Sequence, residues 1–192
     1  SRKRTDSPST NTRKSPKRGV NPFGNLPLSE DIIVEEREAV QQFKDGILDT
    51  EVWFVALGAE LADNAGIKNF IREHKEELRG SIVIDLDGMG AGNLTLIEEE
   101  GKVRRIKASA RIKRYVNKAA SALGMRVESG KMNWRNSATY MIGRNGLPTI
   151  HLVGMENGTP ARAGKADDTF ENLDLAVLEQ NCDYLVELLR TI

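Results

Sequence analysis

The chain has 192 residues, 39% of them hydrophobic, which is enough for one ordinary domain with a buried core. Its 28 basic and 28 acidic residues give a formal net charge of zero, and its single cysteine, Cys182, excludes an internal disulfide and fits a reducing compartment. No apolar run reaches the roughly eighteen residues of a membrane-spanning helix, and no apolar segment typical of a signal peptide follows the basic N-terminus.

Residues 1–19 form a basic segment with seven Lys and Arg against one Asp, whereas the other 173 residues carry a net charge of −6. The segment has no large apolar side chain to offset the entropy cost of ordering, so we expect residues 1–28 to be a disordered basic tail and an extended linker. The plain interpretation is a solvated linker. A sharper one is contact with an anionic membrane surface, on the cytoplasmic flank of a span outside this sequence. Nucleic-acid binding is less favoured, because no aromatic side chains are interleaved to stack on bases.

Residues 29–192 alternate between segments typical of helices and of strands. Helices are expected over about 29–43, 65–78, 108–123 and 171–190, and strands over about 51–58, 81–87, 93–98, 125–129 and 148–153. The segments 51–58 and 81–87 are apolar on both faces, as expected of central strands covered by helices. The alternation predicts an α/β fold, a three-layer αβα sandwich around a mostly parallel or mixed sheet.

Local signals refine the ends of these elements. Gly124 follows the helix over 108–123 as a typical C-terminal cap. Trp53 begins the first strand and should lie in the core. The last helix carries one apolar stripe at spacings of three and four residues, made of Leu175, Leu178, Cys182, Leu185 and Leu189.

Two acidic residues stand where chemistry is expected in such a sheet. Glu60 follows the apolar segment WFVALGA, and Asp87 ends the segment IVIDLD before a glycine-rich turn. In open α/β sheets, sites collect where strands give way to loops, so both carboxylates are candidates for a functional site.

These motifs, together with the turn Gly146-Leu147-Pro148 and the pair Asp168-Thr169, stand in a familiar order. In order and spacing the chain resembles the zinc-dependent aminopeptidases with a two-metal site, a family that also includes glutaminyl cyclases and the transferrin receptor ectodomain. The resemblance runs from about Glu51 to the C-terminus, roughly three quarters of the chain. It implies the fold of the C-terminal part of such a domain.

The resemblance also implies a role for each matching position. Glu60 falls at the general base, and Leu61 stands where a zinc-binding Glu is expected. Asp87 falls at a zinc-binding Asp, and Ala138, after Ser137, replaces another Asp. Gly164 stands where a zinc-binding His precedes the Asp-Thr pair by four residues. The remaining His and the bridging Asp of the family would lie upstream, where this sequence has no His.

A catalytic zinc needs about three protein ligands and a water, so one retained ligand predicts no metal cofactor for this chain alone. We therefore expect a non-catalytic or incomplete peptidase domain of a larger membrane-tethered protein, with a peptide or protein partner. The alternative is an active zinc exopeptidase. Its missing ligands would come from an absent segment or from displaced residues such as Asp85, Asp167 or His151.

Simpler interpretations stand beside these roles. Glu60 is expected to accept hydrogen bonds from backbone donors at the next helix start, and Asp87 to be an ordinary loop carboxylate. Asp168 and Thr169 are expected to cap the final helix, with the Glu171 carboxylate at its positive end. His151, in the apolar strand TIHLVG, is expected to be a hydrogen-bonded core histidine.

Overall fold

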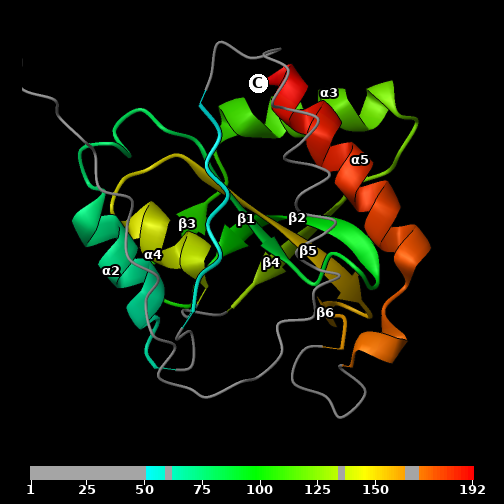
Figure 1. Cartoon of the computed structure of the whole chain (residues 1–192), viewed down its shortest axis with the longest axis horizontal. Helices are drawn as coiled ribbons and strands as arrows, with labels where there is room; N and C mark the ends of the chain where they lie inside the picture. The colour runs from blue at the N-terminus through cyan, green and yellow to red at the C-terminus, as the bar shows by residue number, and fades with distance from the viewer. Residues whose placement is uncertain (1–50, 59–61, 134–136, 163–168) are drawn as a thin grey trace, which may run out of the picture. The chain divides into compact units, whose positions relative to one another are not determined.

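The computed structural model describes residues 51–58, 62–133, 137–162 and 169–192, all within the compact unit Ala39–Ile192. In these residues a mixed sheet is flanked by helices (Figure 1). The strands are β1 (Val83–Asp87), β2 (Asn93–Glu100), β3 (Ile106–Lys107), β4 (Glu128–Met132), β5 (Thr149–Glu156) and β6 (Thr159–Pro160). The helices are α2 (Ala65–Glu73), α3 (Ala110–Ala122), α4 (Ala138–Arg144) and α5 (Leu175–Thr191), with a short 3₁₀ turn, η1 (Phe170–Asn172).

The sheet places its most apolar strand, β5, between β1 and β2. Its order is β1-β5-β2-β3, with β4 on β2 and β6 on β5. Strand β5 pairs in parallel with β1 and antiparallel with β2, and β4 runs parallel to β2. Ile150 and Leu152 of β5 are fully buried. The predicted mixed sheet is therefore confirmed.

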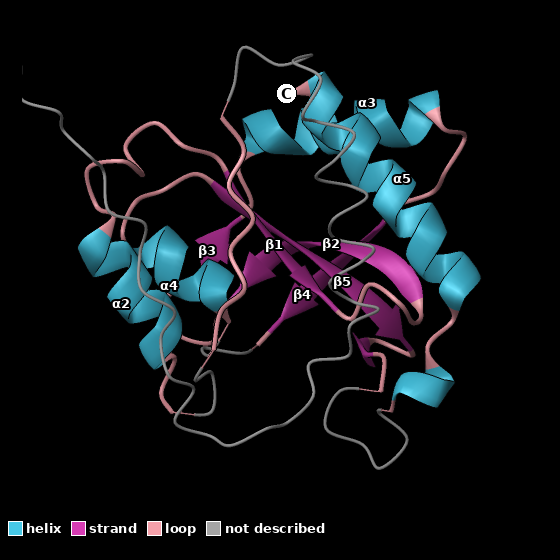
Figure 2. Ribbon diagram, viewed as in Figure 1, coloured by secondary structure: helices cyan, strands magenta, loops and turns pink. Residues whose placement is uncertain are grey.

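Helices cover both faces of the sheet, which confirms the three-layer α/β prediction (Figure 2). Helices α3 and α5 pack on one face against a core that includes Leu94, Leu96, Ile150 and Leu152. Helices α2 and α4 form a second cluster with Val83 of β1 on the other face. In α3 the buried residues Ile112, Val116, Ala119 and Ala120 recur every three or four positions, as burial of one helix face requires.

A register shift in β2 controls which side chains reach the site. The pairing of β2 with β4 shifts between Ile97 and Glu99, as it does at a β-bulge. Such a shift moves the following side chains to the other face of the sheet. Glu100 consequently contacts His151 of β5, and it is only 1% exposed.

The strand predicted over 51–58 is wrong for these residues, which form neither helix nor strand. Trp53, predicted to lie in the core, is 45% exposed. Its ring packs edge-on against Phe70 of α2 and against His74, the C-cap residue of that helix. The physical reason is that an apolar segment becomes a strand only when a neighbouring strand accepts its backbone hydrogen bonds. β1 is consequently the terminal strand of the described sheet, with Leu86 exposed, and is not a central one.

The other predicted elements exist, with shifted ends. Helix α2 ends at Glu73, five residues early, and β4 begins three residues later than expected. Helix α3 ends as predicted, because Gly124 adopts the left-handed conformation that glycine favours, with φ of 63°. The helix expected over 29–43 lies outside the described residues.

The final helix corrects two predictions. Helix α5 begins at Leu175, and its N-cap is Asp174, whose carboxylate accepts from the amides of Ala176 and Val177. Thr169 instead precedes η1 and makes no side-chain cap bond, so the predicted cap of the final helix at Thr169 is wrong, and Asp168 lies outside the described residues. The predicted stripe is also wrong at its start, since Leu175 is 59% exposed and the most buried side chains are Asn181, Tyr184 and Leu188. Hydrophobicity alone does not predict a buried Asn181. Its burial is tolerated because its side-chain amide donates a hydrogen bond to the carbonyl of Met89.

No helix in the described part of the chain is both long and apolar enough to cross a membrane.

Candidate functional site

Asp87 is the last residue of β1 and is exposed, and a turn follows it. The turn closes with a hydrogen bond from the amide of Ala91 to the carbonyl of Gly88 at 3.2 Å. It lies directly on Gly154 of β5, where a Cβ atom would overlap the carbonyl oxygens of both Gly88 and Ala91. The absence of a side chain at Gly154 therefore fixes how closely the Asp87 loop approaches the sheet.

Beneath this loop, Asp85 of β1 connects three elements. One of its carboxylate oxygens accepts from the backbone amide of Thr139 at 2.8 Å and from the Thr139 hydroxyl at 2.7 Å. The same oxygen lies 3.9 Å from Nε2 of His151, its register partner in β5. Asp85 thereby ties β1 to the start of α4 and to β5.

The other ring nitrogen of His151 faces Glu100. Nδ1 lies 3.4 Å from Oε2 of Glu100, and both side chains are 2% exposed. The second oxygen of Glu100, Oε1, has no hydrogen-bond partner in the described residues. His151 thus lies between two carboxylates, one on β1 and one on β2.

This arrangement raises the pKa of His151 above its ordinary value of 6.5. Burial by itself lowers the pKa, because it disfavours the charged ring. The hydrogen bond to Glu100 and the negative charges of Asp85, Glu100 and Asp87 act in the opposite direction and outweigh it. The geometry therefore favours an imidazolium held between carboxylates. The prediction that His151 is a hydrogen-bonded core histidine is confirmed.

Helix α4 begins at the position where the resemblance implied a zinc-binding Asp. Ser137 caps the helix by accepting from the amide of Tyr140 at 2.9 Å, and Ala138 is the first helical residue. The methyl group of Ala138 packs with the apolar cluster of α2 and α4. This position contributes apolar contacts and no electron donor.

The structure brings together some of the predicted site residues. Asp85 and His151 are in contact, and the charge of Asp87 acts on His151. Four of the positions, together with the displaced candidate Asp167, lie outside the described residues: Glu60, Leu61, Gly164 and Asp168.

Glu100 and Thr139 were not predicted from the sequence as residues of the site. Glu100 ends the run Glu98-Glu99-Glu100, and nothing in that run distinguishes a buried glutamate from solvated ones. Thr139 follows Ser137 in a short segment without a helical period. Asp85 did carry a signal for such a neighbour. A carboxylate that faces inward from a strand needs a hydrogen-bond donor close to it.

The sequence model of peptidase family M28 matches residues 36–189. The chain belongs to peptidase family M28. The resemblance to zinc aminopeptidases is thereby confirmed. No curated protein sequence matches the chain.

Solved structures show the fold of this M28 domain. The aminopeptidase from Aneurinibacillus sp. strain AM-1 is 19% identical, with a TM-score of 0.54 over 69% of this chain and 31% of that protein. BSAP, a zinc aminopeptidase from Bacillus subtilis, is 18% identical, with a TM-score of 0.55 over 70% of this chain and 34% of that one. Legionella pneumophila LapA aminopeptidase is 12% identical, with a TM-score of 0.56, covering 82% and 44%. The match thus spans less than half the length of each of these proteins.

The family implies zinc, and the described residues do not fit a two-zinc site. They contain no group of three or more His, Cys, Asp or Glu side chains placed to hold a metal ion. The oxygen of Asp85 that faces His151 already accepts two hydrogen bonds from Thr139. Ala138 and Leu61 have hydrocarbon side chains and Gly164 has no side chain, so none of these three residues offers a side-chain donor atom to a metal.

Proposed function

We propose that this M28 domain is a non-catalytic, aminopeptidase-like binding domain. One observation carries the proposal: Leu61, Ala138 and Gly164 occupy positions where the family resemblance implies zinc ligands. A zinc ion binds to nitrogen, oxygen or sulfur atoms, and a hydrocarbon side chain or a glycine supplies none. Asp87 alone does not provide the three protein ligands that a catalytic zinc requires.

The packing around the former ligand positions supports this proposal. Thr139 supplies two donors to Asp85, and His151 is buried between Asp85 and Glu100. Asp85, Thr139 and His151 thus find polar partners inside the domain, whereas Oε1 of Glu100 has none among the described residues. A buried polar cluster of this kind stabilises a fixed fold, which suits a domain retained for recognition of a peptide or protein.

We also propose that the domain is part of a larger, membrane-tethered protein, at the cytoplasmic face of the membrane. The seven Lys and Arg of residues 1–19 support this proposal, because such charges collect on the cytoplasmic flank of a membrane span. The match to less than half the length of the solved aminopeptidases is consistent with further segments.

The second candidate function is a zinc exopeptidase whose missing ligands come from a segment outside this chain. The retained Asp87 favours it, since the carboxylate is exposed at the end of β1. Under this alternative, zinc binding depends on Asp87 and peptide hydrolysis depends on zinc.

The test measures bound zinc and hydrolysis of aminoacyl p-nitroanilides for the full-length protein that contains this domain, and for its Asp87→Ala variant. We expect far less than one zinc per chain after gel filtration, the same zinc content in both proteins, and no hydrolysis. One tightly bound zinc per chain that disappears in Asp87→Ala, together with zinc-dependent hydrolysis, would overturn the proposal. Unfolding curves of both proteins verify that the variant is folded.

A further inference from the structure

The segment 102–131 is strongly basic although the whole chain is neutral. It contains ten Lys and Arg and a single acidic residue, Glu128. Nine of these ten side chains are exposed, and Lys113, which is ion-paired with Glu98, is half-buried. Most of the cations have no acidic partner within the described residues, Arg105 with Glu99 being an exception. The positive charge is therefore available to a binding partner.

Part of this charge lies along the outer face of α3. Arg111, Arg114 and Lys118 follow at spacings of three and four residues, which places them in one line. Arg111 lies in the first turn, where the helix dipole disfavours a cation, and that turn has no acidic residue. The order of charges along α3 thus costs helix stability, and an external anion would offset that cost.

The rest of the charge lies on the loop between β2 and β3. Lys102, Arg104 and Arg105 surround Val103, which is 87% exposed. An aliphatic side chain this exposed has no role in the core. An exposed valine between cations fits a partner that has an anionic surface and an apolar layer beneath that surface.

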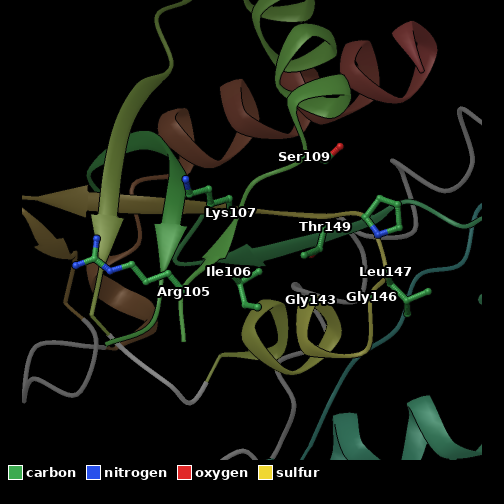
Figure 3. A pocket seen from close by; sticks show the side chains of 9 residues that line it. Arg105, Ile106, Lys107, Ser109, Gly143, Gly146, Leu147 and Thr149 are labelled. Carbon is green, nitrogen blue, oxygen red and sulfur yellow. The ribbon is translucent and has the colours of Figure 1, made fainter. Parts of the chain in front are cut away.

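An open cavity connects the end of this loop to the start of α3. Arg105 and Lys107 line an open cavity of about 430 Å³ together with Ser109, which is the N-cap of α3 (Figure 3). We define the basic face as Lys102, Arg104, Arg105, Lys107, Arg111, Arg114 and Lys118.

We propose that the basic face docks on an anionic lipid membrane through these cations, with Val103 entering the headgroup region. Each Lys or Arg near an anionic leaflet adds about fivefold to membrane binding. The exposed valine favours a bilayer over a nucleic acid, whose recognition relies on polar contacts and stacking. Tyr115 is the only aromatic residue in this segment, and its hydroxyl and ring are both engaged by Arg111. This interaction is separate from the M28 site and does not depend on whether that site is catalytic.

The experiment measures co-sedimentation of the full chain with phosphatidylcholine vesicles, with and without phosphatidylserine. The test variant is Arg111→Gln/Arg114→Gln/Lys118→Gln, because glutamine keeps a similar helix propensity. The matched control is Lys68→Gln/Arg72→Gln/Arg79→Gln, which also removes three exposed cations but removes ones that are ion-paired with Asp63, Glu73 and Glu76. The basic tail is present in both variants and contributes equally.

We expect the wild type to bind the phosphatidylserine vesicles more tightly than neutral ones, and the α3 variant to lose at least about tenfold in partitioning. The control should lose less than about threefold. The proposal is wrong if both variants lose binding equally, or if the α3 variant binds the anionic vesicles as well as the wild type. Circular dichroism melts establish that both variants are folded.

Val103→Ser separates a lipid from a soluble polyanion. We expect it to weaken vesicle binding several-fold while leaving retention on heparin unchanged, because only the bilayer offers an apolar layer. Tight binding of the wild type to DNA without binding to anionic vesicles would overturn the lipid assignment and indicate a nucleic acid. Equal vesicle binding by Val103→Ser and the wild type would contradict the role of the valine.

Discussion

Thr139 holds Asp85 with two hydrogen bonds to a single carboxylate oxygen, one from its backbone amide at 2.8 Å and one from its hydroxyl at 2.7 Å. Thr139 is 5% exposed and lies in the first turn of α4, whereas Asp85 lies in β1. The pair therefore fixes where the helix packs on the edge of the sheet.

Replacing Thr139 with Val should destabilise the domain by about 1.5–3 kcal/mol, the range for a hydrogen bond to a charged group. The shape of the side chain is nearly unchanged, but a half-buried carboxylate loses one of its two donors. Urea unfolding measures the loss. The control is Thr159→Val, since the exposed Thr159 hydroxyl bonds only to a nearby turn carbonyl, and its effect should stay within about 0.5 kcal/mol. Equal losses in both variants would contradict a special role for the Thr139 bond.

The N-cap of α5 gives a second prediction. Asp174→Ala removes the acceptor for two helical amides, those of Ala176 and Val177, each at 3.1 Å. The expected cost is about 1 kcal/mol, within a range of 0.5–2. Ser109→Ala at the N-cap of α3 is the control, because the Ser109 side chain makes no cap bond. A larger loss in the Ser109 variant than in the Asp174 variant would show that cap geometry does not control these helices.

The elements that the sequence predicts well are those in which periodicity and burial agree. In α3 the apolar residues repeat with the helical period, and Gly124 marks the end, so both were predictable. Strand β5 is apolar and buried along almost its whole length. Segment 51–58 is equally apolar, yet its strand prediction failed. An apolar composition indicates that a segment favours burial. A strand also requires a neighbouring strand that accepts its backbone hydrogen bonds.

The candidate site was only half predictable for a related reason. His151 and Asp87 could be selected from the sequence because they interrupt or end apolar strands. Glu100 reaches His151 only because the register of β2 shifts after Ile97, and a one-residue shift has no signature in the sequence. Thr139 matters through its position in space, 54 residues from Asp85. Contacts between residues that are far apart in the sequence, such as Glu100 with His151 and Thr139 with Asp85, thus complete the site.

Gly154 supports a third prediction. Gly154→Ala would place a methyl group against the carbonyl oxygens of Gly88 and Ala91, and backbone atoms in a turn cannot move aside cheaply. The cost should reach or exceed about 1–3 kcal/mol, the usual range for overpacking. Thermal unfolding measures it, with Gly58→Ala as the control, since no atom lies within 4 Å of a Cβ at Gly58. A Gly154 variant as stable as the Gly58 variant would mean that the Asp87 loop does not rest on β5.

The raised pKa of His151 predicts how stability varies with pH. The protonated ring is favoured in the folded state, so its contribution is fully present below the unfolded value of 6.5 and is lost as pH rises through the folded pKa. Between about pH 5 and 8, the difference in unfolding free energy between the wild type and His151→Gln should therefore fall with increasing pH. Proton NMR of the ring should give a midpoint above 6.5, and Glu100→Gln should lower it, because the bond to Glu100 is the largest contribution that raises the pKa. A ring that titrates below 6.5 in the wild type would show that burial outweighs Asp85, Asp87 and Glu100.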